Sequence, residues 1–127
     1  MPKTVLVLLL LVAGASASTA GPGGAKGQLD ALLAEAWEAA LRENPLLATA
    51  TGDHRFDDRL PSMTPADLER RAAYARALLE RLRAVDPEAL PPTDRVSYRM
   101  FDRRLRDDLT EHELGAWRIP IDTEIAA

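Results

Sequence analysis

The sequence predicts an all-α fold, a three-helix section of a larger helical protein. Apolar residues recur at helical spacing in three long segments, and proline, glycine or a capping residue bounds each of them. A content of 46% hydrophobic and 28% charged residues is typical of a folded chain rather than a disordered one. With 127 residues, the chain forms one domain at most.

Composition excludes several classes of function. Acidic residues outnumber basic ones by 20 to 16, whereas nucleic-acid binding needs a surplus of clustered Lys and Arg, so we expect no nucleic-acid partner. The chain has no cysteine, which excludes disulfides, a Cys nucleophile and Cys-based zinc sites. With only two histidines, it has few options for a metal site of its own.

Residues 1–20 have the pattern of a cleavable signal peptide. Lys3 precedes an apolar run from Val5 to Ala13, and cleavage after Ala17 or after Ala20 fits the small residues that follow. The run is shorter than the roughly 20 residues that span a bilayer, so we expect no stable membrane anchor after cleavage. We expect export to the periplasm or the medium, with a buried N-terminal helix or an uncleaved anchor as alternatives. The glycine-rich residues 21–27 are predicted to be a flexible linker.

Residues 28–127 are predicted to form a partial helical domain whose first helix covers 28–44. The helix ends there because the residue before a proline, here Pro45, disfavours helical backbone. Its apolar side consists of Leu29, Leu32, Leu33, Ala36, Trp37, Ala40 and Leu41. Three further alanines make the polar face narrow, so other elements can cover this helix on more than one side.

The segment between Pro45 and Pro61 is less regular, with a short helical turn at Leu46 and Leu47. Three carboxylates and a histidine lie in the loop from Asp53 to Asp58. Their spacing matches no calcium or zinc pattern, and Asp favours turns through local hydrogen bonds. We expect a structural loop, with a ligand-contacting loop as the alternative.

The second helix is predicted over 65–85. Thr64 is placed to cap it, Pro65 occupies its first position, and Asp67 follows in the manner of a capping box. Its apolar stripe consists of Leu68, Ala72, Ala75, Leu79 and Leu82.

A proline-rich connection leads to the third helix, predicted over 94–112. Thr93 is expected to cap it, Asp94 lies in its first turn, and Gly115 is expected to stop it. Its apolar side consists of Tyr98, Phe101, Leu105, Leu109 and His112.

Residues 116–127 are predicted to form an extended tail. Trp117, Ile119 and Ile121 alternate with other residues, which indicates an extended segment, and no partner strand follows. An unpaired apolar segment is unusual in a finished small domain, so we expect the chain to be a truncated product.

We predict no catalytic, cofactor-binding or metal-binding residue in this chain. His112 and Glu113 begin like the zinc motif H-E-x-x-H, but Ala116 holds the position of the second histidine. Ser62 and Ser97 lack a nucleophile-elbow motif, and no histidine lies near them in the sequence to act as a base. The arginines at 99, 103, 104 and 106 alternate with acidic residues, as on a solvated helix face. Trp37 and Trp117 are expected to be core residues.

Several segments together resemble the N-terminal part of the bacterial domain-of-unknown-function 885 family. They are Asn44–Asp53, Phe56–Leu60, Thr64–Glu69, Leu82–Asp86 with Leu90, and Asp94–Tyr98. The shared pattern is a proline and an Ala-Thr pair ahead of a glycine, an acidic loop, a long helix, and a further helix with an early tyrosine.

The resemblance implies the front of a larger exported helical protein. Members of that family look like zinc metallopeptidases of the gluzincin type, with an H-E-x-x-H helix far downstream and a later Glu ligand. Zinc and peptide hydrolysis would belong to the full-length protein, and the missing C-terminal catalytic body, or an unknown protein, would be the partner of this segment. A complete small exported helical binding or adaptor protein is the alternative.

Overall fold

The computed structural model describes residues 23–119, and these residues form an all-α fold. The described part contains no strand. Its elements are α1 (Ala25–Glu43), α2 (Pro45–Ala50), the 3-10 turn η1 (His54–Phe56), α3 (Pro65–Arg83), η2 (Pro87–Ala89), α4 (Pro92–Leu114) and η3 (Ala116–Arg118). The all-α prediction is confirmed, and α2 is a fourth helix in addition to the three long ones that were predicted.

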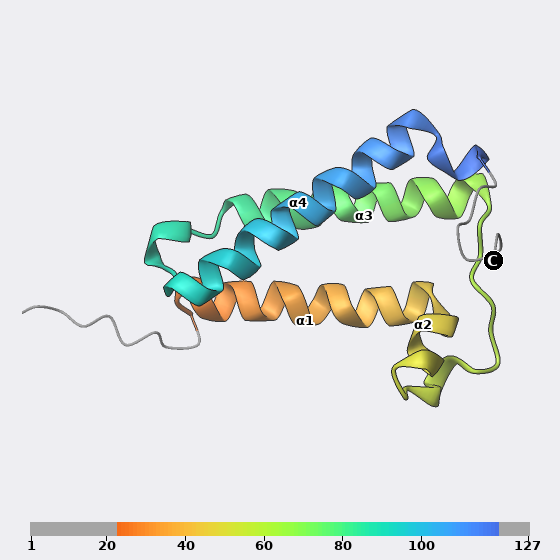
Figure 1. Cartoon of the computed structure of the whole chain (residues 1–127), viewed down its shortest axis with the longest axis horizontal. Helices are drawn as coiled ribbons and strands as arrows, with labels where there is room; N and C mark the ends of the chain where they lie inside the picture. The colour runs from red at the N-terminus through yellow and green to blue at the C-terminus, as the bar shows by residue number, and fades with distance from the viewer. Residues whose placement is uncertain (1–22, 120–127) are drawn as a thin grey trace, which may run out of the picture.

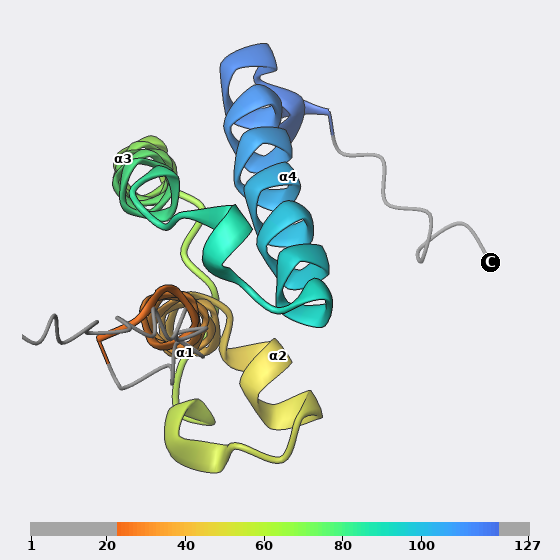
Figure 2. The same cartoon turned by 90° about the vertical axis from the view of Figure 1, so that its left-hand side faces the viewer.

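The three long helices form one bundle. Successive long helices run in opposite directions, and α4 crosses α3 obliquely (Figure 1). Viewed from the end, α1, α3 and α4 occupy three corners, and α2 with η1 lies beside α1 (Figure 2). The pairing of α3 with α4 is the most extensive contact between elements in the described part.

The main core lies toward the end of the bundle where α1 begins. It is built from the N-terminal half of α1, the C-terminal half of α3, the connection after it, and α4. Its buried members are Leu29, Leu32, Leu78, Leu79, Leu82, Val85, Leu90 and Leu105. The predicted stripes supply most of these side chains, while the stripe of α3 is wider than predicted because Leu78 is also buried.

A second, smaller core joins the short elements to α1. Leu41, Ala48 and Phe56 are buried together, and Leu47 packs against them. Arg55 and Arg59 lie over the Phe56 ring, at 5.2 and 5.6 Å from its centre. The segment predicted as a polar loop with one aromatic residue is therefore anchored through that aromatic residue.

Helix α1 begins at Ala25, earlier than predicted. The flexible-linker prediction for 21–27 is wrong for residues 25–27, and residues 21 and 22 lie outside the described part. Lys26 explains the difference, because its Nζ atom is 2.9 Å from Asp30 and 3.5 Å from Asp94 at the start of α4. These contacts and the packing of Ala25 on the core favour helical backbone despite Gly27.

Of the two predicted helix caps, Thr64 is confirmed and Thr93 is wrong. Thr64 caps α3 as predicted, accepting a hydrogen bond from the Asp67 N–H group at 3.2 Å. Thr93 does not cap α4, because the helix begins one residue earlier, at Pro92, with Pro91 in the capping position. A proline fits the first helical position since it has no N–H group to leave unsatisfied.

Gly115 ends α4 in the left-handed conformation, with φ of +65°, as predicted. The extended-tail prediction is wrong for Ala116–Arg118, which form η3, whereas Ile119 has extended backbone. Residues 120–127 and the predicted signal peptide lie outside the described part. Within residues 23–119, no helix is both long and apolar enough to cross a membrane.

Candidate functional site

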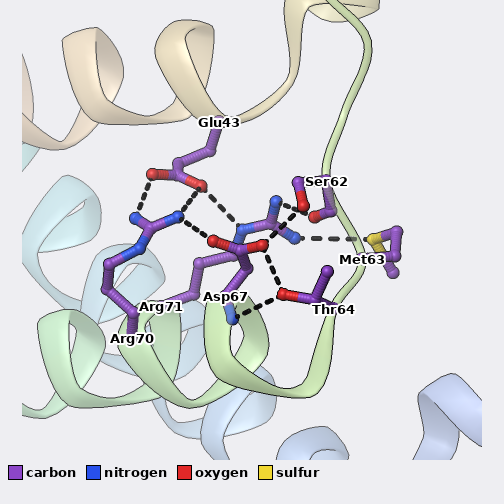
Figure 3. Close-up of polar contacts among 7 residues, drawn as sticks. All are labelled: Glu43, Ser62, Met63, Thr64, Asp67, Arg70 and Arg71. Carbon is purple, nitrogen blue, oxygen red and sulfur yellow. Dashed lines mark hydrogen bonds and ion pairs between the residues drawn. The ribbon is translucent and has the colours of Figure 1, made fainter.

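The densest polar contacts lie where the end of α1 meets the start of α3. We call Glu43, Ser62, Thr64, Asp67, Arg70 and Arg71 the Glu43 cluster (Figure 3). Glu43 extends from the last turn of α1 toward the two arginines of α3, as Figure 3 shows. Its carboxylate accepts from both Nη atoms of Arg70, one of them at 3.1 Å, and from Nε of Arg71 at 2.8 Å.

Asp67 forms the second half of the cluster. Its carboxylate accepts from the hydroxyl groups of Ser62 and Thr64, each at 2.5 Å, and from Arg70 at 3.0 Å. These hydrogen bonds hold the pKa of Asp67 well below its usual value, with Ser62 the largest contributor. The Asp67 side chain therefore stays ionised and cannot act as a general acid near neutral pH.

Hydrogen bonds also lower the pKa of Glu43. The largest contribution comes from Arg70 and a smaller one from Arg71, while desolvation opposes both. Arg71 in turn donates to the Ser62 carbonyl and, at 3.5 Å, to Met63 Sδ. Each acid of the cluster is thus paired, and the arrangement fixes the position of α1 and of the 62–64 segment on α3 rather than presenting a free acid or base.

Polar side chains of the Asp53–Asp58 loop also form hydrogen bonds and ion pairs within the protein. Asp53 caps η1 and accepts from Arg55 Nε at 2.9 Å, while Arg55 also reaches Glu38 on α1 at 3.1 Å. Asp57 accepts from Thr49 Oγ1 at 2.6 Å and lies 2.8 Å from His54 Nδ1. Contacts with Thr49 first, then with His54, lower the pKa of Asp57. These contacts favour the structural interpretation of the loop.

His112 links α4 to α3. Its Nε2 atom is 2.9 Å from Glu69 Oε2, and Arg76 contacts the other carboxylate oxygen of Glu69 at 3.1 Å. Arg76 first, then His112, lower the pKa of Glu69. The partner lies 43 positions away in the sequence, which is why sequence spacing did not reveal it.

The arginines of α4 are mostly paired along their own helix, as predicted. Arg103 with Asp107, Arg104 with Asp108 and Arg106 with Asp102 are ion pairs of 2.9, 2.8 and 2.7 Å. All three arginines are exposed, which agrees with the predicted solvated face.

Sequence reasoning missed a groove between α3 and α4. It has a volume of about 540 Å³, and the side chains of α3 that line it include Leu68, Ala72 and Ala75. Arg104, Asp108, Glu111 and His112 form the wall on α4, with Ala116 and Trp117 at one end. We call this cavity the α3–α4 groove. The small residues in the predicted stripe of α3 were the signal that could have indicated it.

Both tryptophans are more exposed than predicted. Trp37 is 47% exposed and Trp117 is 41% exposed, so their assignment to the core is wrong. The main core takes Leu29 and Leu32 from α1, in the first half of the helix, so that Trp37 lies beyond it. Trp117 borders the α3–α4 groove and stacks with Arg118, whose guanidinium carbon is 4.9 Å from the ring centre.

The arrangement of the described residues does not fit a metal site. Among residues 23–119, no three His, Asp or Glu side chains are placed to hold an ion together. One ring nitrogen of each histidine contacts a carboxylate, His54 Nδ1 that of Asp57 and His112 Nε2 that of Glu69.

Comparison with known families gives one match. The model of a family described as "Bacterial protein of unknown function (DUF885)" matches residues 45–126, which covers α2 through η3 and the residues after them. No curated protein and no solved structure matches the chain.

Proposed function

The chain belongs to the DUF885 family of bacterial proteins of unknown function, and from this membership we propose that it forms the N-terminal helical section of an exported zinc metallopeptidase. Its role is to support the catalytic body, and peptide-bond hydrolysis is the activity of the full-length protein. The family match over residues 45–126 is the observation that carries the proposal.

The polar contacts support a structural role for this section. The Glu43 cluster joins α1 to α3, Arg55 joins η1 to α1 through Glu38, and His112 joins α4 to α3. Side chains that often perform acid–base chemistry are here used to connect elements. In this proposal, the zinc ligands are a downstream H-E-x-x-H helix and a later Glu, because Ala116 holds the position of the second histidine after His112 and Glu113.

The exposed apolar side chains support contact with a further body of protein. Trp37, Val96, Met100 and Leu114 are large apolar residues that the described helices leave between 47% and 79% exposed. Val96 and Met100 are four positions apart on α4, so they share one exposed apolar helix face, and contiguous apolar faces are typical of interaction sites. The proposal assigns it to packing against the catalytic body.

The coding DNA tests this proposal. We would sequence beyond the codon for Ala127 and translate all three forward frames. The expected result is a frame that encodes an H-E-x-x-H helix with a later Glu. If the sequence up to the next gene contains no such frame, the proposal is overturned, and the chain is better explained as a small exported helical binding or adaptor protein.

Export has its own test. We expect the mature protein in the periplasm or the medium to begin directly after Ala17 or Ala20, because both positions fit the cleavage pattern. Intact mass measurement of the secreted and cell-associated protein identifies the first residue. A chain that retains Met1 in all fractions would contradict the signal-peptide prediction.

A further inference from the structure

The α3–α4 groove lies toward the start of α3, where the bundle is less filled than at the main core. The main core takes its side chains from the C-terminal half of α3, whereas Leu68, Ala72 and Ala75 line the groove. The two alanines are too small to fill the space between the helices, so about 540 Å³ stays open. Figure 1 shows that α4 ends and α3 begins at this end of the molecule. The volume lies in the range of about 300–1,000 Å³ that is typical of binding sites.

The two walls of the groove are rows of side chains at helical spacing. Positions 68, 72 and 75 of α3 are four and three apart, and positions 104, 108 and 111 of α4 repeat this spacing. Each row covers about 10 Å, or two helical turns. A helix that binds in a groove between helices presents its anchoring side chains at the same spacing. The groove therefore fits one face of a helix over about two turns.

The apolar lining selects large apolar side chains in the bound helix. Leu68, Ala72 and Ala75 form the apolar wall, and Met63 and Trp117 also line the groove while 58% and 41% exposed. Large side chains pack well over small ones such as alanine, because packed interiors interdigitate. Methionine adapts its shape to a partner, and tryptophan is common among the residues that contribute most to binding.

The free charge along the groove is negative. Arg71 pairs with Glu43 at 2.8 Å, and Arg104 pairs with Asp108 at 2.8 Å, so both arginines of the lining already have carboxylate partners. Glu111 also lines the groove and is exposed, and it has no ion pair within residues 23–119. Charge complementarity therefore favours a basic residue in the occupant.

We propose that the α3–α4 groove binds an amphipathic helix of another protein, with large apolar side chains at positions four and three apart and a lysine or arginine beside them. The apolar side chains fill the space over Ala72 and Ala75, and the basic residue pairs with Glu111. The inference goes beyond the proposed function and does not rest on it, because neither zinc nor peptide hydrolysis enters the argument.

A displayed library of helical peptides is the probe. Leucine or phenylalanine is fixed at three positions with this spacing, the flanking positions vary freely, and the library is selected on the immobilised full chain. Two variants alter the groove: Ala75→Leu fills it, and Glu111→Lys reverses its free charge. Their matched controls are Ala73→Leu and Glu113→Lys, at exposed positions of the same helices that do not line the groove. Circular dichroism verifies that each variant folds.

The expected result is enrichment of lysine and arginine over aspartate and glutamate at the flanking positions. Binding of the enriched peptides should weaken at least tenfold in Ala75→Leu and in Glu111→Lys, and stay within about twofold in the two controls. If no peptide binds, if acidic flanks are enriched, or if a folded groove variant binds as its control does, the inference is overturned. Self-association of the chain that Glu111→Lys abolishes would overturn it too, because a second copy would then fill the groove. Should Ala75→Leu fail to fold, the exposed Glu111→Lys substitution still decides the question.

Discussion

Glu43 is a single residue that joins two helices of the fold, α1 and α3. It is the last residue of α1, and its carboxylate meets Arg70 and Arg71, which lie 27 and 28 positions later on α3. The Glu43 side chain is 30% exposed and that of Arg71 is 27% exposed, so water screens this pair less than a fully exposed one. The pairing therefore contributes to stability more than a typical surface ion pair.

Replacing Glu43 by glutamine is expected to destabilise the protein by about 1–2 kcal/mol, because a charged hydrogen-bond acceptor is lost while Arg71 stays half-buried. Urea denaturation followed by circular dichroism measures the difference. Glu80→Gln is the control, since Glu80 pairs with Arg83 of the same helix and both side chains are exposed, and we expect a change within about 0.5 kcal/mol. Equal effects of the two substitutions would contradict the role given to the Glu43 cluster.

Stability is also expected to fall in acid through Glu43. Its pKa is lower in the folded protein than its usual value of 4.5, so its contribution is present above pH 4.5 and is lost as the pH falls through the folded pKa. The free energy of unfolding, measured from pH 7 down to pH 3, should therefore decline less steeply for Glu43→Gln than for the parent. Parallel curves would show that Glu43 does not contribute this dependence.

The capping residues before α3 and α4 differ in how well they predict where each helix begins. Thr64 follows an ordinary capping sequence, and the structure confirms it. Thr93 is also a threonine in front of a predicted helix, but α4 begins one residue before it, at Pro92. Pro91 and Pro92 therefore determine where α4 begins. Local sequence is ambiguous at this point because a proline and a threonine compete for the same role.

These two threonines give a matched pair of substitutions. We expect Thr64→Ala to lower stability by about 1 kcal/mol, because the Asp67 N–H group loses its acceptor. We expect Thr93→Ala to change stability by less than about 0.5 kcal/mol, since Thr93 is exposed and caps nothing. Thermal unfolding of both variants measures the contrast, and a larger loss for Thr93→Ala would contradict the boundary of α4.

The other end of α4 depends on Gly115. A non-glycine residue is strained at its φ of +65°, so Gly115→Ala is expected to cost about 1 kcal/mol. Gly23→Ala is the control, because Gly23 has no positive φ and open space around it. Denaturant titration compares the two, and an equal change for both would contradict a structural need for glycine at position 115.

At the scale of the molecule, periodicity predicted the three long helices and most of the core, since burial follows the apolar stripe of each helix. It did not predict which helix faces remain uncovered. Trp37 is exposed because the main core takes its side chains from the first half of α1, and the groove beside Ala72 and Ala75 depends on how α4 packs against α3. The sequence of a single helix does not specify either arrangement. For the same reason, the contact between His112 and Glu69 was missed, because its partners lie on different helices.

At the scale of the whole protein, we propose that this segment supports a zinc metallopeptidase without ligating its metal. The most direct measurement is the zinc content of the full-length protein that the proposal predicts, purified as the parent and as a variant with both His54→Ala and His112→Ala. We expect each to hold one zinc ion per polypeptide and to hydrolyse peptides. A parent that binds zinc and a variant that loses it, while still folded by circular dichroism, would contradict the claim.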